Sequence, residues 1–269
     1  MKRTRLPIGI GLVFAAFLPT AWACGPDTDC NIGERTYRIE MPKEPPKGAL
    51  IYAHGYRGSA KAVMRNKALR ALAQENGLAL IAPKSFREDW RIPGVPADPG
   101  TDGAEEFTYF DALLDTLKME HAIPADRIYM SGFSAGGMMV WNLACRMGSR
   151  FAGFIPIAGT FWDPVPPECP DLGAHMVHIH GRADKIVPLG GRPIGPTRQG
   201  DVPQALALFA ERGGKSLAKV RPFGELDCRA YSPDNDGRSL SFCTHPGGHS
   251  IKMDYLRAAF TILREQGAF

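Results

Sequence analysis

A serine flanked by glycines lies where a predicted strand meets a predicted helix. Residues 127–137 read Arg-Ile-Tyr-Met-Ser-Gly-Phe-Ser-Ala-Gly-Gly, and helix-forming residues follow over 138–147. The β-branched and aromatic run predicts a strand, and the glycines permit a sharp, strained turn that would expose the Ser134 hydroxyl. The segment therefore predicts a nucleophilic serine, although a Gly-x-Ser-x-Gly pentapeptide alone also occurs by chance in turns.

A serine nucleophile needs a base, a group that orients the base, and donors for the oxyanion. The pentapeptide between a strand and a helix is typical of the nucleophile elbow of α/β-hydrolases, in which an acid and then a histidine follow the serine along the chain. Asp184 follows a predicted strand (176–180) and a glycine turn, so we expect it to be the acid. Asp163 and Asp171, after the preceding strand, are the alternatives.

The expected base is His249, which follows two glycines just before the last predicted helix, with His245 as the alternative. His178 and His180 fall within a predicted strand and are expected to be core histidines. Together with His175 they form a His-x-x-His-x-His pattern, but residues 175 and 178 point to opposite faces of a strand. We therefore predict no metal site and no cofactor.

The oxyanion donors are expected to be the backbone N–H groups of Ala135, in the elbow, and Tyr56, in the glycine loop after a short apolar strand (49–53). His54 is expected to brace that loop. Trp90 and Trp162 are the predicted substrate-binding residues. Trp90 lies in a proline-rich loop (85–103) expected at the carboxyl edge of the sheet, where ligands bind. Trp162 follows the strand after the elbow, and the alternative is that it covers the core.

Strands and helices alternate along the chain, which predicts an α/β fold with a mostly parallel central sheet and helices on both faces. No linker or repeat is evident, so we expect a single domain. The predicted strands are 35–41, 49–53, 78–82, 151–158, 176–180 and 217–222, the predicted helices are 60–74, 105–121, 202–212 and 252–266, and 226–231 with 239–243 would form an edge hairpin.

The first residues have the pattern of a secretory signal. A basic start precedes an apolar run (8–18) and the small-x-small site Ala21-Trp22-Ala23. We therefore expect 1–23 to be removed, leaving 24–269 as a secreted or periplasmic domain without stable membrane insertion; lipidation at Cys24 is the alternative. Six cysteines in an exported chain suggest disulfides, paired by sequence proximity as Cys24–Cys30, Cys228–Cys243 and Cys145–Cys169.

Charge does not indicate a nucleic-acid partner. The 269-residue chain carries 32 basic and 28 acidic residues, but three of the basic ones lie in the first five positions, which leaves 29 against 28. No basic patch with interleaved aromatic residues is present. Oligomeric state is not indicated by the sequence.

Seven motifs recur along the chain in the order of a known family: Cys24-Gly25, Cys30, Arg35-x-Tyr37, His54-Gly55-Tyr56, Gly132-Phe133-Ser134-Ala135-Gly136-Gly137, His180-Gly181-x-x-Asp184-x-x-Val187-Pro188 and Gly247-Gly248-His249. Through them the chain resembles secreted α/β-hydrolase esterases that include polyhydroxybutyrate depolymerase-like and feruloyl esterase-like enzymes. The resemblance implies a Ser134–His249–Asp184 triad without metal, acting on carboxylic esters through an acyl-enzyme. Hydroxyalkanoate esters or oligomers are the expected substrates. Feruloyl or acetylxylan esters, acyl transfer, and a non-catalytic secreted binding protein are the alternatives.

Two features differ from many relatives. Ser250-Ile251 stands after the histidine where Trp-Pro is usual, and the tryptophan-rich segment before the elbow helix is reduced to Trp90. Both differences lie where substrate is expected.

Overall fold

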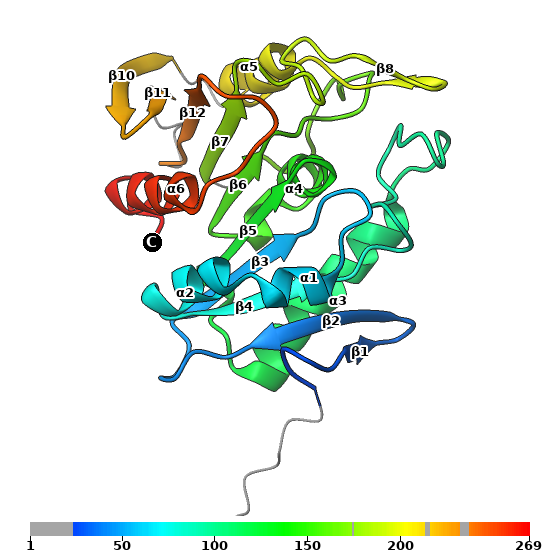
Figure 1. The fold of residues 1–269 in the computed structure, drawn as a ribbon, viewed down its shortest axis with the longest axis vertical. Helices are drawn as coiled ribbons and strands as arrows, with labels where there is room; N and C mark the ends of the chain where they lie inside the picture. The colour runs from blue at the N-terminus through cyan, green and yellow to red at the C-terminus, as the bar shows by residue number, and fades with distance from the viewer. Residues whose placement is uncertain (1–23, 174, 213–215, 232–236) are drawn as a thin grey trace, which may run out of the picture.

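The computed structural model describes residues 24–173, 175–212, 216–231 and 237–269 (Figure 1). The predicted signal segment (1–23) and most of the predicted hairpin turn lie outside these residues. The described strands form a ten-stranded sheet in the order β1-β2-β4-β3-β5-β6-β7-β12-β11-β10. Their bounds are β1 Cys30–Ile32, β2 Arg35–Glu40, β3 Gly48–Ala53, β4 Leu78–Pro83, β5 Ile128–Phe133, β6 Gly153–Ile157, β7 His175–Gly181, β10 Leu217–Phe223, β11 Leu226–Tyr231 and β12 Leu240–His245.

The centre of the sheet is parallel and its two ends are antiparallel. The run β4-β3-β5-β6-β7-β12 is parallel throughout, whereas β1 and β2 at one end and β11 and β10 at the other are antiparallel to their neighbours. Parallel strands are buried on both faces, which explains why β3 and β4 are apolar runs without alternation. The carboxyl ends of the parallel strands therefore meet at one edge of the sheet.

Helices cover both faces of the sheet. Buried residues of α3, α4 and α5 belong to one hydrophobic cluster, and those of α1, α2 and α6 belong to a second cluster. The predicted mostly parallel α/β architecture with helices on both faces is thus confirmed. The helix bounds are α1 Ala60–Arg65, α2 Lys67–Glu75, α3 Ala104–His121, α4 Ala135–Arg146, α5 Val202–Arg212 and α6 Met253–Glu265, and two 3₁₀ turns are η1 Ala125–Arg127 and η2 Gly148–Arg150.

Several predicted elements were wrong in detail. The single helix expected over 60–74 is two helices, because the Asn66 side chain accepts a hydrogen bond from the Leu69 N–H (3.1 Å) and caps a new helix. The predicted edge hairpin is not at the edge: β12 lies between β7 and β11, and β10 forms the edge. The helix after Ser134 begins at Ala135 rather than at residue 138. The segment between β7 and α5, for which no strand was predicted, contains a small ribbon, β8 Pro193–Ile194 and β9 Thr197–Arg198.

The three expected disulfides are present. Cys24–Cys30 links the first described residue to β1, and Cys145–Cys169 joins the end of α4 to the loop after β6. Cys228–Cys243 links directly opposed residues of β11 and β12. Within the described part of the chain, no helix is both long enough and apolar enough to cross a membrane.

Candidate active site

Ser134 occupies a strained turn between β5 and α4. Its backbone has φ 59° and ψ −123°, a region that non-glycine residues rarely adopt. The conformation is held from both sides, because its N–H donates to the Ile157 carbonyl and its carbonyl accepts from the Met138 N–H, each at 2.9 Å. Strand, turn and helix therefore form the nucleophile elbow predicted from the sequence.

The elbow glycines are required by close packing rather than by positive φ. A Cβ atom on Gly136 would lie 2.1 Å from the carbonyl oxygen of Ala53 at the end of β3. On Gly132 it would lie 2.5 Å from the Gly136 carbonyl, and on Gly137 it would lie 2.6 Å from that of Ile157. Only glycine lets α4 begin directly against β3, β5 and β6.

Asp184 follows the carboxyl end of β7 and is 6% exposed. Its Oδ1 accepts the backbone N–H groups of Ile186 (2.8 Å) and Val187 (2.9 Å), and its Oδ2 faces Nδ1 of His249 at 2.7 Å. Burial by itself would raise the pKa of the Asp184 carboxyl. The hydrogen bonds from His249 and the two N–H groups outweigh burial and hold that pKa below its usual value. The Asp184 side chain is thus an ionised acceptor with a fixed orientation.

His249 lies on the glycine loop between β12 and α6. Its ring packs against Phe133, the residue before Ser134, with the ring centroids 4.6 Å apart. Because Nδ1 is engaged by Asp184, Nε2 is the ring nitrogen left for a proton transfer. In the described residues no hydrogen bond joins the Ser134 hydroxyl to His249. The structure therefore brings acid and base together and places the base beside the elbow.

The alternative acid Asp171 and the alternative base His245 are engaged elsewhere. Asp171 Oδ2 accepts from the N–H and hydroxyl of Ser149. His245 is 1% exposed and stacks on Tyr255, and its Nδ1 accepts the Gly247 N–H (3.2 Å). Burial lowers the pKa of the His245 imidazole.

The loop expected to complete the oxyanion hole approaches the serine closely. A Cβ atom on Gly55 would lie 3.6 Å from Cβ of Ser134, and the next residue, Tyr56, lines the same pocket as Ser134 and Ala135. Ala135 is the first residue of α4, and the first N–H groups of a helix have no acceptor within it. Both predicted donors thus border the space beside the serine.

His54 and Trp90 hold this loop in place. The His54 ring Nε2 accepts the Ser85 N–H (3.3 Å), and the indole N–H of Trp90 donates to the His54 carbonyl (2.8 Å). Burial lowers the pKa of the His54 imidazole, so the ring is a neutral brace. Trp90 is 0% exposed and lines the hollow along the loop after β4 rather than the pocket that contains Ser134, so its contact with substrate stays a prediction.

A pocket of about 340 Å³ opens in front of Ser134. Its wall is mostly apolar and includes Trp162, which was predicted to bind substrate, together with Met138 and Ile186. Apolar walls with a few placed polar groups are typical of small-molecule sites, which span about 300–1,000 Å³. The polar side chains of the wall, other than the serine and tyrosine already described, are Asp89, Arg192 and Gln199.

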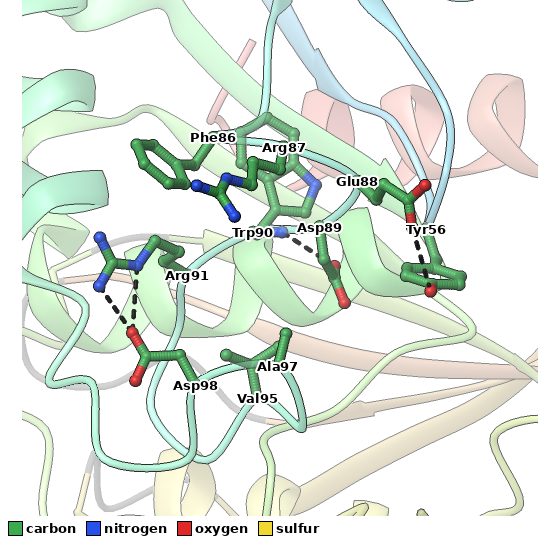
Figure 2. A pocket seen from close by; sticks show the side chains of 10 residues that line it. All are labelled: Tyr56, Phe86, Arg87, Glu88, Asp89, Trp90, Arg91, Val95, Ala97 and Asp98. Carbon is green, nitrogen blue, oxygen red and sulfur yellow. Dashed lines mark hydrogen bonds and ion pairs between the residues drawn. The ribbon is translucent and has the colours of Figure 1, made fainter.

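A second hollow of about 740 Å³ adjoins the Ser134 pocket (Figure 2). The two share Tyr56, Asp89 and Ala97, so the Ser134 pocket continues along the loop that follows β4. Figure 2 shows the Asp89 carboxyl group next to the Trp90 backbone N–H, which donates to its Oδ1 at 2.9 Å, with the Tyr56 ring on the other side. Burial raises the pKa of the Asp89 carboxyl to about 6; the Trp90 N–H opposes that rise and the negative charge of Glu106 adds to it.

Sequence reasoning missed Asp89, Arg192 and Gln199. Asp89 lies in a loop rich in proline and the other two border the short β8–β9 ribbon, so no periodic pattern of hydrophobic residues indicates where they lie. The only sequence feature that could have indicated them is their position after a parallel strand, at the edge of the sheet where ligands bind.

His178 and His180 form a buried pair within β7. His178 Nε2 lies 3.1 Å from His180 Nδ1, and His180 Nε2 donates to the Val187 carbonyl at 2.7 Å. Burial is the main cause that lowers the pKa of both rings, which are therefore neutral core residues beneath the acid loop. Among the residues that the structure describes, no group of three or more His, Cys, Asp or Glu side chains is arranged to hold a metal ion.

Comparison with known proteins connects this geometry to ester hydrolysis. The family described as Phospholipase/Carboxylesterase matches residues 101–193, which include the elbow and Asp184. NocK of Nocardia uniformis subsp. tsuyamanensis, which carries the name of an esterase, is 28% identical over 80% of this chain and 70% of its own length. Probable feruloyl esterase C of Aspergillus terreus is 21% identical over 93% of this chain and 90% of its own length.

Poly(3-hydroxyalkanoate) depolymerase C of Paucimonas lemoignei is 38% identical over 48% of this chain, and the matched segment covers 33% of that protein. Among solved structures, an acetyl xylan esterase from Aspergillus awamori superimposes with a TM-score of 0.62 at 12% identity, covering 91% of this chain and 96% of that one. At this identity the likeness shows the fold alone. It confirms the α/β-hydrolase fold as a single domain.

These similarities confirm the resemblance to α/β-hydrolase esterases that was predicted from the motifs. The prediction of a carboxylic ester hydrolase is confirmed as well.

Proposed function

We propose that the chain is an exported serine esterase that hydrolyses short hydroxyalkanoate esters or oligomers. The observation that carries the proposal is the Asp184–His249 hydrogen bond of 2.7 Å beside a strained serine that faces a mostly apolar pocket. The similarity of 48% of the chain to a poly(3-hydroxyalkanoate) depolymerase supports this substrate class. Three disulfides and the signal-like residues 1–23 support export.

The proposed first half-reaction forms an acyl-enzyme. Ser134 Oγ attacks the ester carbonyl carbon while His249 Nε2 takes the hydroxyl proton. Asp184 keeps the other ring nitrogen protonated and stabilises the imidazolium that forms. The backbone N–H groups of Tyr56 and Ala135 stabilise the oxyanion. The C–O bond to the alcohol then breaks, and His249 returns the proton to the departing alcohol oxygen.

The second half-reaction releases the acid. Water takes the place of the alcohol, His249 accepts one of its protons, and the resulting hydroxide attacks the acyl carbon. Collapse of the second tetrahedral intermediate breaks the bond to Ser134 Oγ, which regains its proton from His249. The net change is one ester and one water converted to one alcohol and one acid.

Hydrolysis of 4-nitrophenyl acetate by the wild type and by Ser134→Ala tests the mechanism. We expect the variant to lose of the order of 10⁶-fold in kcat, as when a triad serine is removed, and to keep the wild-type melting curve. Turnover retained by Ser134→Ala would reject Ser134 as the nucleophile. A wild type without turnover would reject the esterase and favour a non-catalytic binding protein. Comparing hydroxybutyrate oligomers with methyl ferulate and acetylated xylan then identifies the substrate class.

A feruloyl ester is the second candidate substrate. The relative named as a probable feruloyl esterase covers nearly the whole chain, and Trp162 offers an aromatic surface in the Ser134 pocket. Higher kcat/KM on methyl ferulate than on hydroxybutyrate oligomers would support it.

A further inference from the structure

Asp89 and Arg192 are the charged side chains in the wall of the Ser134 pocket, and they reach it from opposite sides. Asp89 is on the loop after β4, and Arg192 is on the segment after β7 that enters the β8–β9 ribbon. In the sheet order β4-β3-β5-β6-β7, these two strands lie on either side of β5, which carries Ser134 at its end. An ester bound across the serine would therefore have one end toward Asp89 and the other toward Arg192.

Arg192 is held in place by two hydrogen bonds to the backbone, but its positive charge has no acidic partner among the described residues. Its Nε donates to the Ile186 carbonyl (2.7 Å), and its carbonyl accepts the Gln199 N–H (2.9 Å) across the ribbon. No carboxylate among the described residues lies within ion-pair distance of it, whereas Arg91 in the adjoining hollow is neutralised by Asp98 at 2.6 Å. A guanidinium held in this way presents its two terminal nitrogens as a fork, which matches a carboxylate.

Asp89 offers the complementary group. One of its oxygens accepts the Trp90 N–H, and within the described residues the carboxyl group makes no ion pair. It borders both hollows next to Tyr56, so a hydroxyl group entering from the pocket finds a carboxyl oxygen without another protein partner. A second carboxylate placed there would be repelled, which fixes the direction in which a substrate with one acidic end can bind.

We infer that the Ser134 pocket is a two-ended recognition site for a short hydroxy-acid ester, in which Arg192 binds the terminal carboxylate and Asp89 binds the terminal hydroxyl. The inference rests on the proposed function and makes it more specific. The carboxylate belongs to the departing alcohol and the hydroxyl to the acyl group. Hydrolysis of one such dimer yields two molecules of free hydroxy acid. Feruloyl and acetyl esters of sugars lack the carboxylate that would engage Arg192.

The 3-hydroxybutyrate dimer and its derivatives test each end separately. The first measurement is the ratio of kcat/KM for the free-acid dimer to that for its methyl ester, and the second is the ratio for the dimer to its O-methyl ether. Chromatography of the products counts only cleavage of the internal ester. We expect the wild type to prefer the dimer in both comparisons.

The variants Arg192→Gln and Asp89→Leu should act on different ratios. Arg192→Gln should lower the carboxylate ratio by about 10- to 100-fold, the usual effect of losing a hydrogen bond to a charged group. Asp89→Leu should lower the hydroxyl ratio and leave the carboxylate ratio high. Arg198→Gln is the matched control, because Arg198 lies on the same ribbon, also donates to a backbone carbonyl (Gly190, 2.9 Å), and stands outside the Ser134 pocket.

Three results would overturn the two-ended site: a wild type without preference for the free acid, equal loss in Arg192→Gln and Arg198→Gln, or an Arg192→Gln effect of the same size on both ratios. Thermal melting of each variant shows that it is folded. The proposed function fails separately, since a wild type that does not hydrolyse 4-nitrophenyl acetate is no esterase. A wild type that hydrolyses 4-nitrophenyl acetate but shows no preference for the free-acid dimer contradicts the two-ended site and leaves the proposed esterase standing.

Discussion

Replacing Asp184 by asparagine should remove catalysis while leaving the fold in place. The carbonyl oxygen of asparagine can take the position of Oδ1 and keep the hydrogen bonds from the N–H groups of Ile186 and Val187. Its NH₂ group then replaces Oδ2 and donates toward Nδ1 of His249. Nδ1 must become the acceptor, so the ring proton moves to Nε2. A protonated Nε2 cannot take the proton of Ser134.

The size of the effect follows from this change of tautomer. The same replacement in other Ser-His-Asp enzymes lowers kcat by about 10⁴-fold, or about 5.4 kcal/mol in activation free energy. The cost in stability is smaller, because one charge-assisted hydrogen bond contributes about 1.5–3 kcal/mol. Asp184→Ala should differ, since it leaves two buried N–H groups without an acceptor at about 1–3 kcal/mol each.

The assay compares kcat on 4-nitrophenyl acetate with the free energy of unfolding in urea. Asp184→Asn should be nearly inactive and lose no more than about 3 kcal/mol in stability, whereas Asp184→Ala should be inactive and less stable than Asp184→Asn. Asp163→Asn, at the alternative acid, serves as the control and should retain activity. A folded Asp184→Asn that loses less than about tenfold in kcat would refute the assignment of Asp184 as the orienting acid.

Three further predictions concern the structure around the site. Gly136→Ala places a Cβ atom 2.1 Å from the Ala53 carbonyl and should lower the free energy of unfolding by at least about 1–3 kcal/mol, measured by urea titration. The double variant Cys145→Ala with Cys169→Ala opens a disulfide of sequence separation 24 and should cost about 3.5 kcal/mol in the chain-entropy model; equal urea midpoints for variant and oxidised wild type would contradict it. Asp89 has its pKa raised to about 6 by burial, so the folded state holds its proton longer than the unfolded chain, and stability should fall as pH rises from about 4 to about 6. Asp89→Asn should abolish that fall, and melting temperatures across this range test it.

The parts of the site that could be predicted from the sequence have local signatures. Gly132 and Gly136 mark the elbow because packing of α4 against β3 excludes a side chain at Gly136, and the same residues were visible as a motif. The Asp184 loop was recognisable from an apolar strand ending in a glycine turn. His249 was recognisable as the histidine on a glycine loop before the last helix.

Other features depend on contacts that a linear pattern does not contain. Asn66 was expected to continue a helix because its neighbours are helix formers, but its side chain caps the next one. β12 was expected in an edge hairpin because a turn sequence separates it from β11, whereas its parallel pairing with β7 places it inside the sheet. The hydrogen bond from the Trp90 indole N–H to the His54 carbonyl, which holds the ring under the loop, could not be predicted from the sequence either. The interior position of β12 thus arises from a long-range strand partner, whereas the break at Asn66 arises from a cap on a residue only three positions away.

In the proposed enzyme, chemistry and selectivity are carried by different parts of the chain. Ser134, Asp184 and His249 each lie within four residues of the end of a parallel strand (β5, β7 and β12), so the sheet itself fixes their relative positions. Arg192 follows β7 by 11 residues and is positioned by the ribbon and the Ile186 carbonyl. Changes in that loop can move the guanidinium without moving the acid. Replacing the β8–β9 ribbon by a loop of different sequence should thus alter which ester is hydrolysed fastest, while the protein still hydrolyses esters through an acyl-enzyme.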